Sequence, residues 1–280
     1  MEITQAVPVG ALGMKSEEMG VEEKRANRLS VVVVTKNEER NIRDCLNTAR
    51  WADEIVIVDA YSTDLTAEIA KEFTDKIYQR SWEGFGIQKN FAMQKATCPW
   101  VFILDSDERI PEELRDEIRG VITSAPPSVA GYLVARKNYY YGHWIQAGGA
   151  YPDYQLRLLR NGLGSLDNAE PHNKMVLKGD QGVLGSPLIH LTSPTVGDHL
   201  RKMPNFSRLA AQEKYKTKKT VGWYDLFFPP LATFLKMFFS KGAWKEGIAG
   251  LVYSGFASLY TFLKYARLWE MLHAKPGQRR

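Results

Sequence analysis

The stretch that decides the fold is residues 29–59, LSVVVVTKNEERNIRDCLNTARWADEIVIVD. Residues 29–35 and 54–59 are runs of β-branched and aliphatic side chains, which are typical of strands buried on both faces of a sheet. Between them, residues 38–50 repeat apolar side chains at the spacing of a helix. A strand, a helix and a second strand in this order predict a βαβ unit with parallel strands.

The same alternation continues towards the C-terminus. We expect a helix over residues 64–73, a short strand over 76–79, a helix over 86–97 and a strand over 100–105 (WVFILD). Strands that alternate with helices predict an α/β fold with a mostly parallel sheet.

The pattern changes after a helix that we expect to begin at Pro111, because proline favours the first helical position. Residues 131–141, 155–160 and 175–177 read as further strands, and residues 148–153 form a glycine-rich loop between two of them. We expect these strands to continue the sheet in a mixed arrangement and to complete a cleft.

Charge and composition divide the chain into regions. Residues 1–200 hold 22 Lys and Arg against 28 Asp and Glu (net −6), whereas residues 201–280 hold 15 against 4 (net +11). We expect a flexible leader at 1–28 without the apolar run of a secretory signal, a globular α/β domain at 29–200, and a basic amphipathic helical tail at 201–280. Only two cysteines are present, which excludes a disulfide framework and a multi-cysteine zinc site.

The tail has the features of helices that lie in a membrane interface. Residues 226–235 and 247–263 carry no charge, and the second is 17 residues long, short of the roughly 20 residues that span a bilayer. Basic residues and tryptophans border these segments, as they do in interfacial helices. A helical lid on the sheet or an oligomer contact is the alternative. Nucleic acid is not an expected partner, because the residues between the basic ones are aliphatic or glycine.

Polar and acidic residues follow three of the predicted strands, where each strand ends. Ligands of parallel sheets bind beyond the carboxyl ends of the strands, so we expect these residues to converge on one crevice. They are Thr35, Asn37 and Glu38 after the first strand, Asp59 and Ser62 after the second, and Asp105, Ser106 and Asp107 after the fourth. Helix capping and turn formation could account for each set taken alone.

Asp105 and Asp107 are two carboxylates placed two residues apart at a strand end. Such a pair can share a divalent ion and its phosphates, because Mg²⁺ and Mn²⁺ prefer a few carboxylates together with phosphate oxygens and water. His190 and His199, in stretches read as polar loops, are either structural or contacts to metal or diphosphate.

The combination of motifs resembles a family 2 glycosyltransferase of the GT-A fold, whose sheet is Rossmann-like. The similar stretches are VVVVTKNEERNIRDCL (31–46), EIVIVDAYSTDLTAEIA (54–70), GFGIQKNFAMQKATCPWVFILDSDE (84–108) and GGAYPDYQLRLLRNG (148–162), which stand in the family's order. The resemblance is closest to bacterial lipopolysaccharide-core glucosyltransferases.

The resemblance implies roles for residues of this chain. Asp59 would accept from a uracil ring, Asp105 would meet the ribose, and Asp107 would hold Mg²⁺ or Mn²⁺. The full nucleotide-sugar set implied is Thr35, Asn37, Glu38, Asp59, Ser62, Lys89, Asn90, Asp105 and Ser106. The family usually shows Ser-Gly-Ser-Thr-Asp after the second strand, whereas this chain has Tyr61 in place of the glycine.

An inverting transferase needs a carboxylate that deprotonates the acceptor hydroxyl. Asp153 stands where the wider family places this base, with Glu170 or His172 as alternatives and a turn aspartate as the structural interpretation. Related sequences often carry a glutamate where this chain has Asn173, which cannot act as a base.

The resemblance thus implies an inverting enzyme that moves a sugar, expected to be glucose, from a UDP-sugar to a cell-envelope glycan or lipid-linked acceptor such as lipopolysaccharide core. We expect it in the cytoplasm, peripheral at the inner face of the cytoplasmic membrane, with residues 201–280 on the anionic surface. Two alternatives stay open. One is a nucleotidyltransferase, although the glycine-rich loop typical of those enzymes is missing after residue 35; the other is a non-catalytic membrane-binding protein on the same fold.

Overall fold

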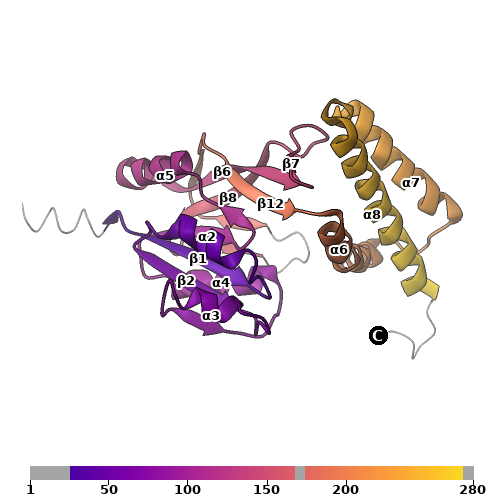
Figure 1. Ribbon diagram of the computed structural model, residues 1–280. Helices are drawn as coiled ribbons and strands as arrows, with labels where there is room; N and C mark the ends of the chain where they lie inside the picture. The colour runs from indigo at the N-terminus through magenta and orange to yellow at the C-terminus, as the bar shows by residue number, and fades with distance from the viewer. Residues whose placement is uncertain (1–25, 168–173, 274–280) are drawn as a thin grey trace, which may run out of the picture.

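The structure is a computed structural model that describes residues 26–167 and 174–273, built around a central sheet (Figure 1). Within these residues the sheet has ten strands, and its main path runs β3-β2-β1-β4-β8-β6-β12-β5. The first four strands of this path are parallel and lie where the sequence predicts strands. They span Leu29–Thr35 (β1), Glu54–Asp59 (β2), Ile77–Gln79 (β3) and Trp100–Asp105 (β4).

The second half of the sheet is mixed, as expected. β8 (Asp153–Arg160) runs antiparallel to both β4 and β6 (Val129–Tyr140), and β12 (Leu188–Ser193) runs parallel to β6. The smaller strands are β5 (Glu108–Arg109), β7 (His143–Trp144) and β11 (Asp180–Val183) in this sheet, and β9 (Gly164–Leu166) and β10 (Met175–Leu177) in a separate pair.

Helices cover both faces of the parallel half and enclose its core. α2 (Ile42–Ala49) and α5 (Glu112–Ser124) bury their apolar stripes against one face, which includes Trp100 and Phe102. α4 (Phe85–Lys95) covers the other face. Because β1, β2 and β4 lie between these layers, almost all of their side chains are buried, which explains their unbroken apolar sequences.

Two predicted helices have different bounds in the structure. α3 covers only Thr66–Ala70 of the predicted 64–73, and just before it the Asp64 carboxylate accepts from the Thr66 amide at 3.0 Å. Pro111 is the residue that precedes α5 rather than its first helical residue.

The tail forms three helices, which Figure 1 shows beside the sheet. α6 (Val196–Thr217) begins five residues before the predicted start of the helical tail at residue 201, because Thr195 and Asp198 form a capping box at its start. α7 (Trp223–Leu235) and α8 (Gly247–His273) pack side by side, joined by a π-helical segment (Lys236–Ser240) and a 3₁₀ turn (Ala243–Glu246). Among the described helices, none is both long and apolar enough to cross a membrane.

Two consecutive prolines, Pro229 and Pro230, lie inside α7 rather than at its end. Their neighbours use side-chain hydroxyls to satisfy the carbonyl groups nearby, since Thr233 donates to the Pro229 carbonyl at 2.8 Å and Ser258 of α8 donates to the Pro230 carbonyl at 2.9 Å. The Ser258 bond thus joins α8 to the proline-containing part of α7.

The predicted leader, residues 1–28, lies outside the described residues except for its last three. The division at residue 200 stays a prediction, and α6 crosses that boundary.

Candidate functional site

A cleft of about 1200 Å³ opens beyond the carboxyl ends of β1 and β4. These two strands are parallel neighbours, so their ends meet at the same edge of the sheet. The wall opposite is made by β8, β12 and the first half of α6. Seven residues that the sequence singled out line the cleft: Thr35, Glu38, Lys89, Asp105, Ser106, Asp107 and His190.

Asp105 lies at the end of β4 between two cations. Lys89 Nζ is 2.6 Å from Asp105 Oδ1, and Arg157 donates to Oδ2 at 2.7 Å. Burial alone would raise the pKa of Asp105, but Arg157 and Lys89 outweigh burial and hold that pKa well below its usual value. The carboxylate is therefore charged at neutral pH.

Arg157 is held in turn by Glu108, a fully buried residue that sequence analysis did not single out. Glu108 also accepts from the Asp105 amide at 3.0 Å. Burying a charged arginine is costly unless it is paired, and here two carboxylates raise the pKa of Arg157 despite the burial. The Asp105–Arg157–Glu108 network thus fixes the end of β4 electrostatically.

Asp107 faces a second pair of nitrogen groups. His190 Nε2 is 3.5 Å from Asp107 Oδ1, and Lys202 Nζ is 3.2 Å from Oδ2. Burial raises the pKa of Asp107, but His190 and Lys202 outweigh it and bring the pKa down to about 2. His190 itself is on β12, not in a loop as predicted, with Nδ1 2.6 Å from Asn138 Oδ1. His199, also predicted in a loop, is on α6.

Among the described residues of the cleft, Asp107 and His190 form a pair that could hold a metal ion. Within the described ranges, no cluster of three or more His, Cys, Asp or Glu side chains has the arrangement of a metal site. A carboxylate and an imidazole fit an ion that takes its remaining ligands from diphosphate oxygens and water, as Mg²⁺ and Mn²⁺ commonly do. These two protein ligands therefore fit a metal ion that is bound together with a diphosphate.

Thr35 and Glu38 form the β1 side of the cleft. Thr35 is buried, and its hydroxyl has no hydrogen-bond partner among the described residues. Buried polar atoms are normally paired, so an orphaned hydroxyl on a cleft wall indicates a ligand atom as its partner. Burial raises the pKa of Glu38.

Asn37, Asp59 and Ser62 do not line the cleft but bind one another behind it. Ser62 donates to Asp59 through its amide at 2.9 Å and its hydroxyl at 2.5 Å, and the Asn37 amide donates to the Ser62 hydroxyl at 2.8 Å. Asp59 is fully buried by these contacts. Tyr61, which replaces the family's glycine, has a φ of 54°, a region that favours glycine. These hydrogen bonds join the two loops that follow β1 and β2, and the predicted contacts of Asn37, Asp59 and Ser62 with a nucleotide stay a prediction.

Asn90 is not among the residues that line the cleft. It exchanges two 2.8 Å hydrogen bonds with the backbone of Leu166, a lining residue, and so joins α4 to β9. Its neighbour Lys89 lines the cleft and pairs with Asp105.

Asp153 lies at the start of β8, beside two cleft residues. Its carboxylate accepts from Arg136 at 2.6 and 3.0 Å, from Asn138 at 3.1 Å and from Gln155 at 2.8 Å. Burial raises the pKa of Asp153, but Arg136 and the two amides together lower it below the usual value, so the group is ionised at neutral pH. Arg136 and Gln155 line the cleft. The alternatives Glu170 and His172 lie outside the described residues.

Sequence analysis missed the cleft wall that α6 supplies. The wall consists of Arg201, Lys202, Asn205, Phe206, Arg208 and Leu209. Because these residues stand in a basic helical stretch, the sequence predicted that they lie on the surface. No local pattern indicates that Lys202 binds Asp107, which stands 95 residues earlier in the chain.

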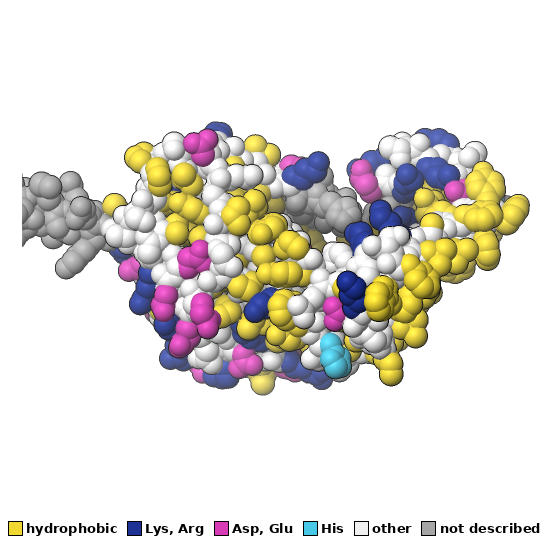
Figure 2. All heavy atoms as spheres, turned by 90° about the horizontal axis from the view of Figure 1, so that it is seen from above, with side chains coloured by type: hydrophobic (Ala, Val, Ile, Leu, Met, Phe, Trp, Pro, Cys, Tyr) yellow, Lys and Arg dark blue, Asp and Glu magenta, His cyan; other side chains and the backbone are white. Residues whose placement is uncertain are grey.

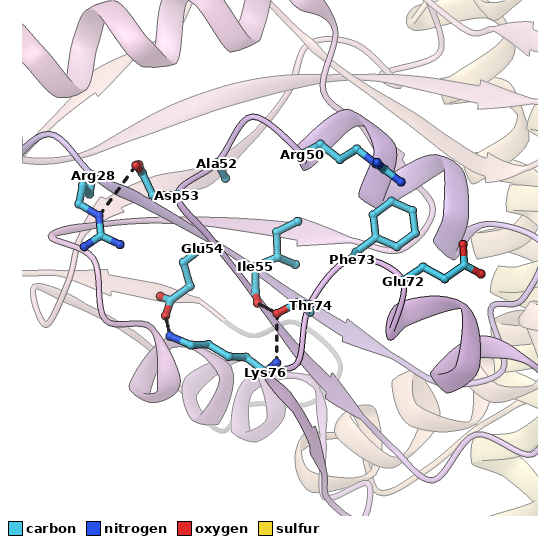
Figure 3. A pocket seen from close by; sticks show the side chains of 10 residues that line it. All are labelled: Arg28, Arg50, Ala52, Asp53, Glu54, Ile55, Glu72, Phe73, Thr74 and Lys76. Atoms are coloured by element: carbon cyan, nitrogen blue, oxygen red, sulfur yellow. Dashed lines mark hydrogen bonds and ion pairs between the residues drawn. The ribbon is translucent and has the colours of Figure 1, made fainter.

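A second, smaller pocket of about 290 Å³ opens at the opposite end of the strands (Figure 3). Four of its charged side chains form two pairs: Arg28 lies 3.8 Å from Asp53, and Lys76 binds Glu54. This pocket contains none of the residues that the sequence singles out for the site, so the strand-end cleft is the candidate site.

Residues 30–180 match the family model of glycosyl transferase family 2. A lipopolysaccharide core biosynthesis glycosyltransferase, LpsC of Rhizobium meliloti (strain 1021), is 30% identical over 258 residues, covering 89% of this chain and 95% of that protein. An uncharacterized glycosyltransferase of Rickettsia typhi is 28% identical, over 87% of each chain. Among solved structures, the mannosyltransferase PcManGT from Pyrobaculum calidifontis, in complex with GDP-Man and Mn²⁺, is 15% identical with a TM-score of 0.49, over 92% of this chain and 97% of that one. The chain belongs to glycosyl transferase family 2, and its mixed α/β sheet is the GT-A fold that the sequence predicted.

Proposed function

We propose that the protein is an inverting, metal-dependent hexosyltransferase that moves a sugar, expected to be glucose, from a UDP-sugar to a glycan or lipid-linked acceptor such as lipopolysaccharide core. The observation that carries the proposal is the cleft itself, where Asp105, Asp107 and the orphaned Thr35 hydroxyl face one space. The similarity to LpsC supports a cell-envelope acceptor.

On this proposal the strand ends bind the donor. Thr35 and Glu38 would contact the nucleoside, and Asp105 would accept from the ribose while Lys89 and Arg157 keep it charged. Asp107 and His190 would hold Mg²⁺ or Mn²⁺, and a bound divalent ion neutralises charge on the leaving diphosphate. Asn37, Asp59 and Ser62 would act by shaping the loops around the nucleotide.

Asp153 is the proposed base. It would take the proton from the acceptor hydroxyl while that oxygen bonds to the anomeric carbon and the bond to the diphosphate breaks. Attack from the face opposite the diphosphate inverts the anomeric centre, so an α-linked donor gives a β-glycoside. The ionised state of Asp153 at neutral pH supports this role.

The tail is the proposed membrane contact. Six apolar side chains of α7 are exposed along one side of the helix, and Trp223 is 73% exposed. We name them the α7 face: Trp223, Tyr224, Phe227, Phe228, Leu231 and Leu235. Figure 2 shows hydrophobic side chains gathered along the end of the molecule that the tail forms.

Exposed lysines lie next to the α7 face. Lys236, Lys241 and Lys245 follow it in the chain, within a tail of net charge +11. An apolar aromatic face bordered by lysines fits the interface of an anionic membrane. The proposed location is therefore the inner face of the cytoplasmic membrane, where a lipid-linked acceptor would meet the cleft.

Calorimetric titration of UDP with and without Mn²⁺ tests the donor site. Wild-type protein is expected to bind UDP more tightly with Mn²⁺, and Asp107→Asn is expected to lose that difference. Asp116→Asn, an exposed carboxylate of α5, is the matched control and should behave as wild type. Absence of UDP binding under both conditions would overturn the UDP-sugar assignment.

A further inference from the structure

The loop that leads into Asp153 is held by the tail. Glu246, in the turn between α7 and α8, accepts with Oε1 from the amides of Gln146 and Ala147 at 3.0 and 2.9 Å. The Gly148 amide donates to the Lys241 carbonyl at 2.9 Å. Three consecutive amides of the loop are thus bound by residues about 100 positions later in the chain.

The packing of this contact leaves little room for movement. Gly148 and Gly149 have φ values of 69° and 81°. A Cβ at Gly148 would lie 3.1 Å from the Cβ of Ala243, which is fully buried, and 3.1 Å from the Tyr253 ring. Gly148 therefore lets the loop backbone lie directly on the turn.

A continuous set of bonds joins this contact to the proposed base. Asn138 of β6 donates to the Ala150 carbonyl at 3.0 Å and to Asp153 Oδ2 at 3.1 Å. The Ile145 amide donates to the Asn138 carbonyl at 3.1 Å, at the other end of the loop. A shift of the loop would therefore move Asn138 and the Asp153 carboxylate together.

We infer that Glu246 is a positioning residue for the catalytic step. By holding loop 145–152, it fixes the position of the Asp153 carboxylate, and the turn between α7 and α8 therefore contributes to sugar transfer. This inference rests on the proposed role of Asp153. Its chemistry is specific, because one carboxylate oxygen satisfies two adjacent amides that the loop itself leaves unpaired.

The test separates positioning of the base from donor binding. Glu246→Ala is expected to lower kcat by about tenfold to 100-fold, because small misplacements of a catalytic group have effects of this size, while KM for the donor and Kd for UDP stay within about twofold. Glu246→Gln keeps an oxygen that accepts from both amides, so it is expected to retain kcat within about threefold. Glu270→Ala, exposed on the same helix α8, is the matched control.

Gly148→Ala damages the same loop-turn contact from the loop side, because its Cβ would press on Ala243 and Tyr253, and it keeps the test decisive if Glu246→Ala folds poorly. This variant is also expected to lower kcat while the KM for the donor and the Kd for UDP stay unchanged. The variant that carries both substitutions should lower kcat by less than the product of the two single effects, because both act on one contact. Unchanged kcat in Glu246→Ala overturns the inference, and so does an equal loss of UDP binding, which would mean general structural support. Either result leaves the metal-dependent UDP titration, and with it the donor site, standing.

Discussion

In the strand-end cleft the two carboxylates at the end of β4 are mostly buried and are paired with nitrogen groups, whereas on α7 it is the large apolar side chains that are exposed. Asp105 and Asp107 each have two nitrogen partners and lowered pKa values. Phe227 and Phe228 have more than half of their surface in solvent. Buried charges and exposed apolar side chains both raise the free energy of the protein alone. A ligand in the cleft, or an apolar surface against α7, would lower it. The cleft fits an anionic, hydrogen-bonding ligand, and the α7 face fits an apolar one.

The largest effect that separates the two regions should come from the proposed base. Asp153→Asn is expected to lower kcat by about 10²–10⁴-fold, because it removes the proton acceptor while keeping the shape of the side chain. The affinity for UDP should stay within about twofold of wild type, because Asp153 is not among the residues that line the cleft. Steady-state kinetics and calorimetry measure the two quantities, with exposed Asp180→Asn as the control. Activity within threefold of wild type would place the base elsewhere.

Truncation of a phenylalanine in each region compares their contributions to stability. Phe102→Ala in the core should lower the free energy of unfolding by about 3–5 kcal/mol, because the side chain is fully buried in a packed layer. Phe227→Ala on the α7 face, 57% exposed, should change it by no more than about 0.5 kcal/mol. Urea unfolding followed by circular dichroism measures both. A loss of more than about 2 kcal/mol in Phe227→Ala would mean that α7 is a structural element and not a free surface.

Acid should weaken the sheet through Glu54. Burial raises the pKa of Glu54, but bonds from Lys76, Ser30 and Thr97 outweigh it and lower the pKa from 4.5 to about 2. The carboxylate therefore stabilises the fold above pH 4.5, and this contribution, up to about 3 kcal/mol, is lost as pH falls towards 2. Glu54→Gln should be less stable than wild type at pH 7 and should converge with it near pH 2. Thermal unfolding between pH 7 and 2 measures the difference, and parallel curves for the two proteins would contradict the prediction.

The smallest effect concerns the α7 face. Phe227→Ser combined with Phe228→Ser should weaken binding to anionic vesicles by about tenfold or more, because interfacial affinity scales with buried apolar area. UDP binding should not change. Val183→Ser removes an equally exposed apolar side chain from β11 and serves as the control. Flotation with anionic and neutral lipid measures binding. Equal flotation of wild type and double variant would exclude the α7 face as the contact.

Local pattern was enough to predict most of the parallel half of the fold. β4 has the predicted bounds, since a short apolar run ending in Asp105 has one reasonable interpretation as a buried strand. The neighbouring parallel strand β1 then brings Thr35 and Asp107 to the same edge, which is why part of the cleft followed from sequence.

The remaining site residues could not be predicted, because their roles depend on contacts between distant segments. Nothing in the vicinity of Asp59 indicates that Ser62 and Asn37 would enclose it. Arg136 and Glu108 acquire their roles only when β6 and β8 meet β4. The left-handed backbone at Tyr61, with a φ of 54°, is likewise a property of the folded loop that its sequence does not predict.

The bond from Lys202 of α6 to Asp107 also has a consequence for the order in which the protein matures during synthesis. The parallel strands and their helices are complete once residue 124 has been made, so this half can begin to fold while translation continues. The wall that Lys202 belongs to is translated about 80 residues later, next to the segments that form the α7 face. A nascent chain therefore holds Asp107 without one of its counter-charges until its last third emerges, and the cleft is finished at nearly the same time as the tail.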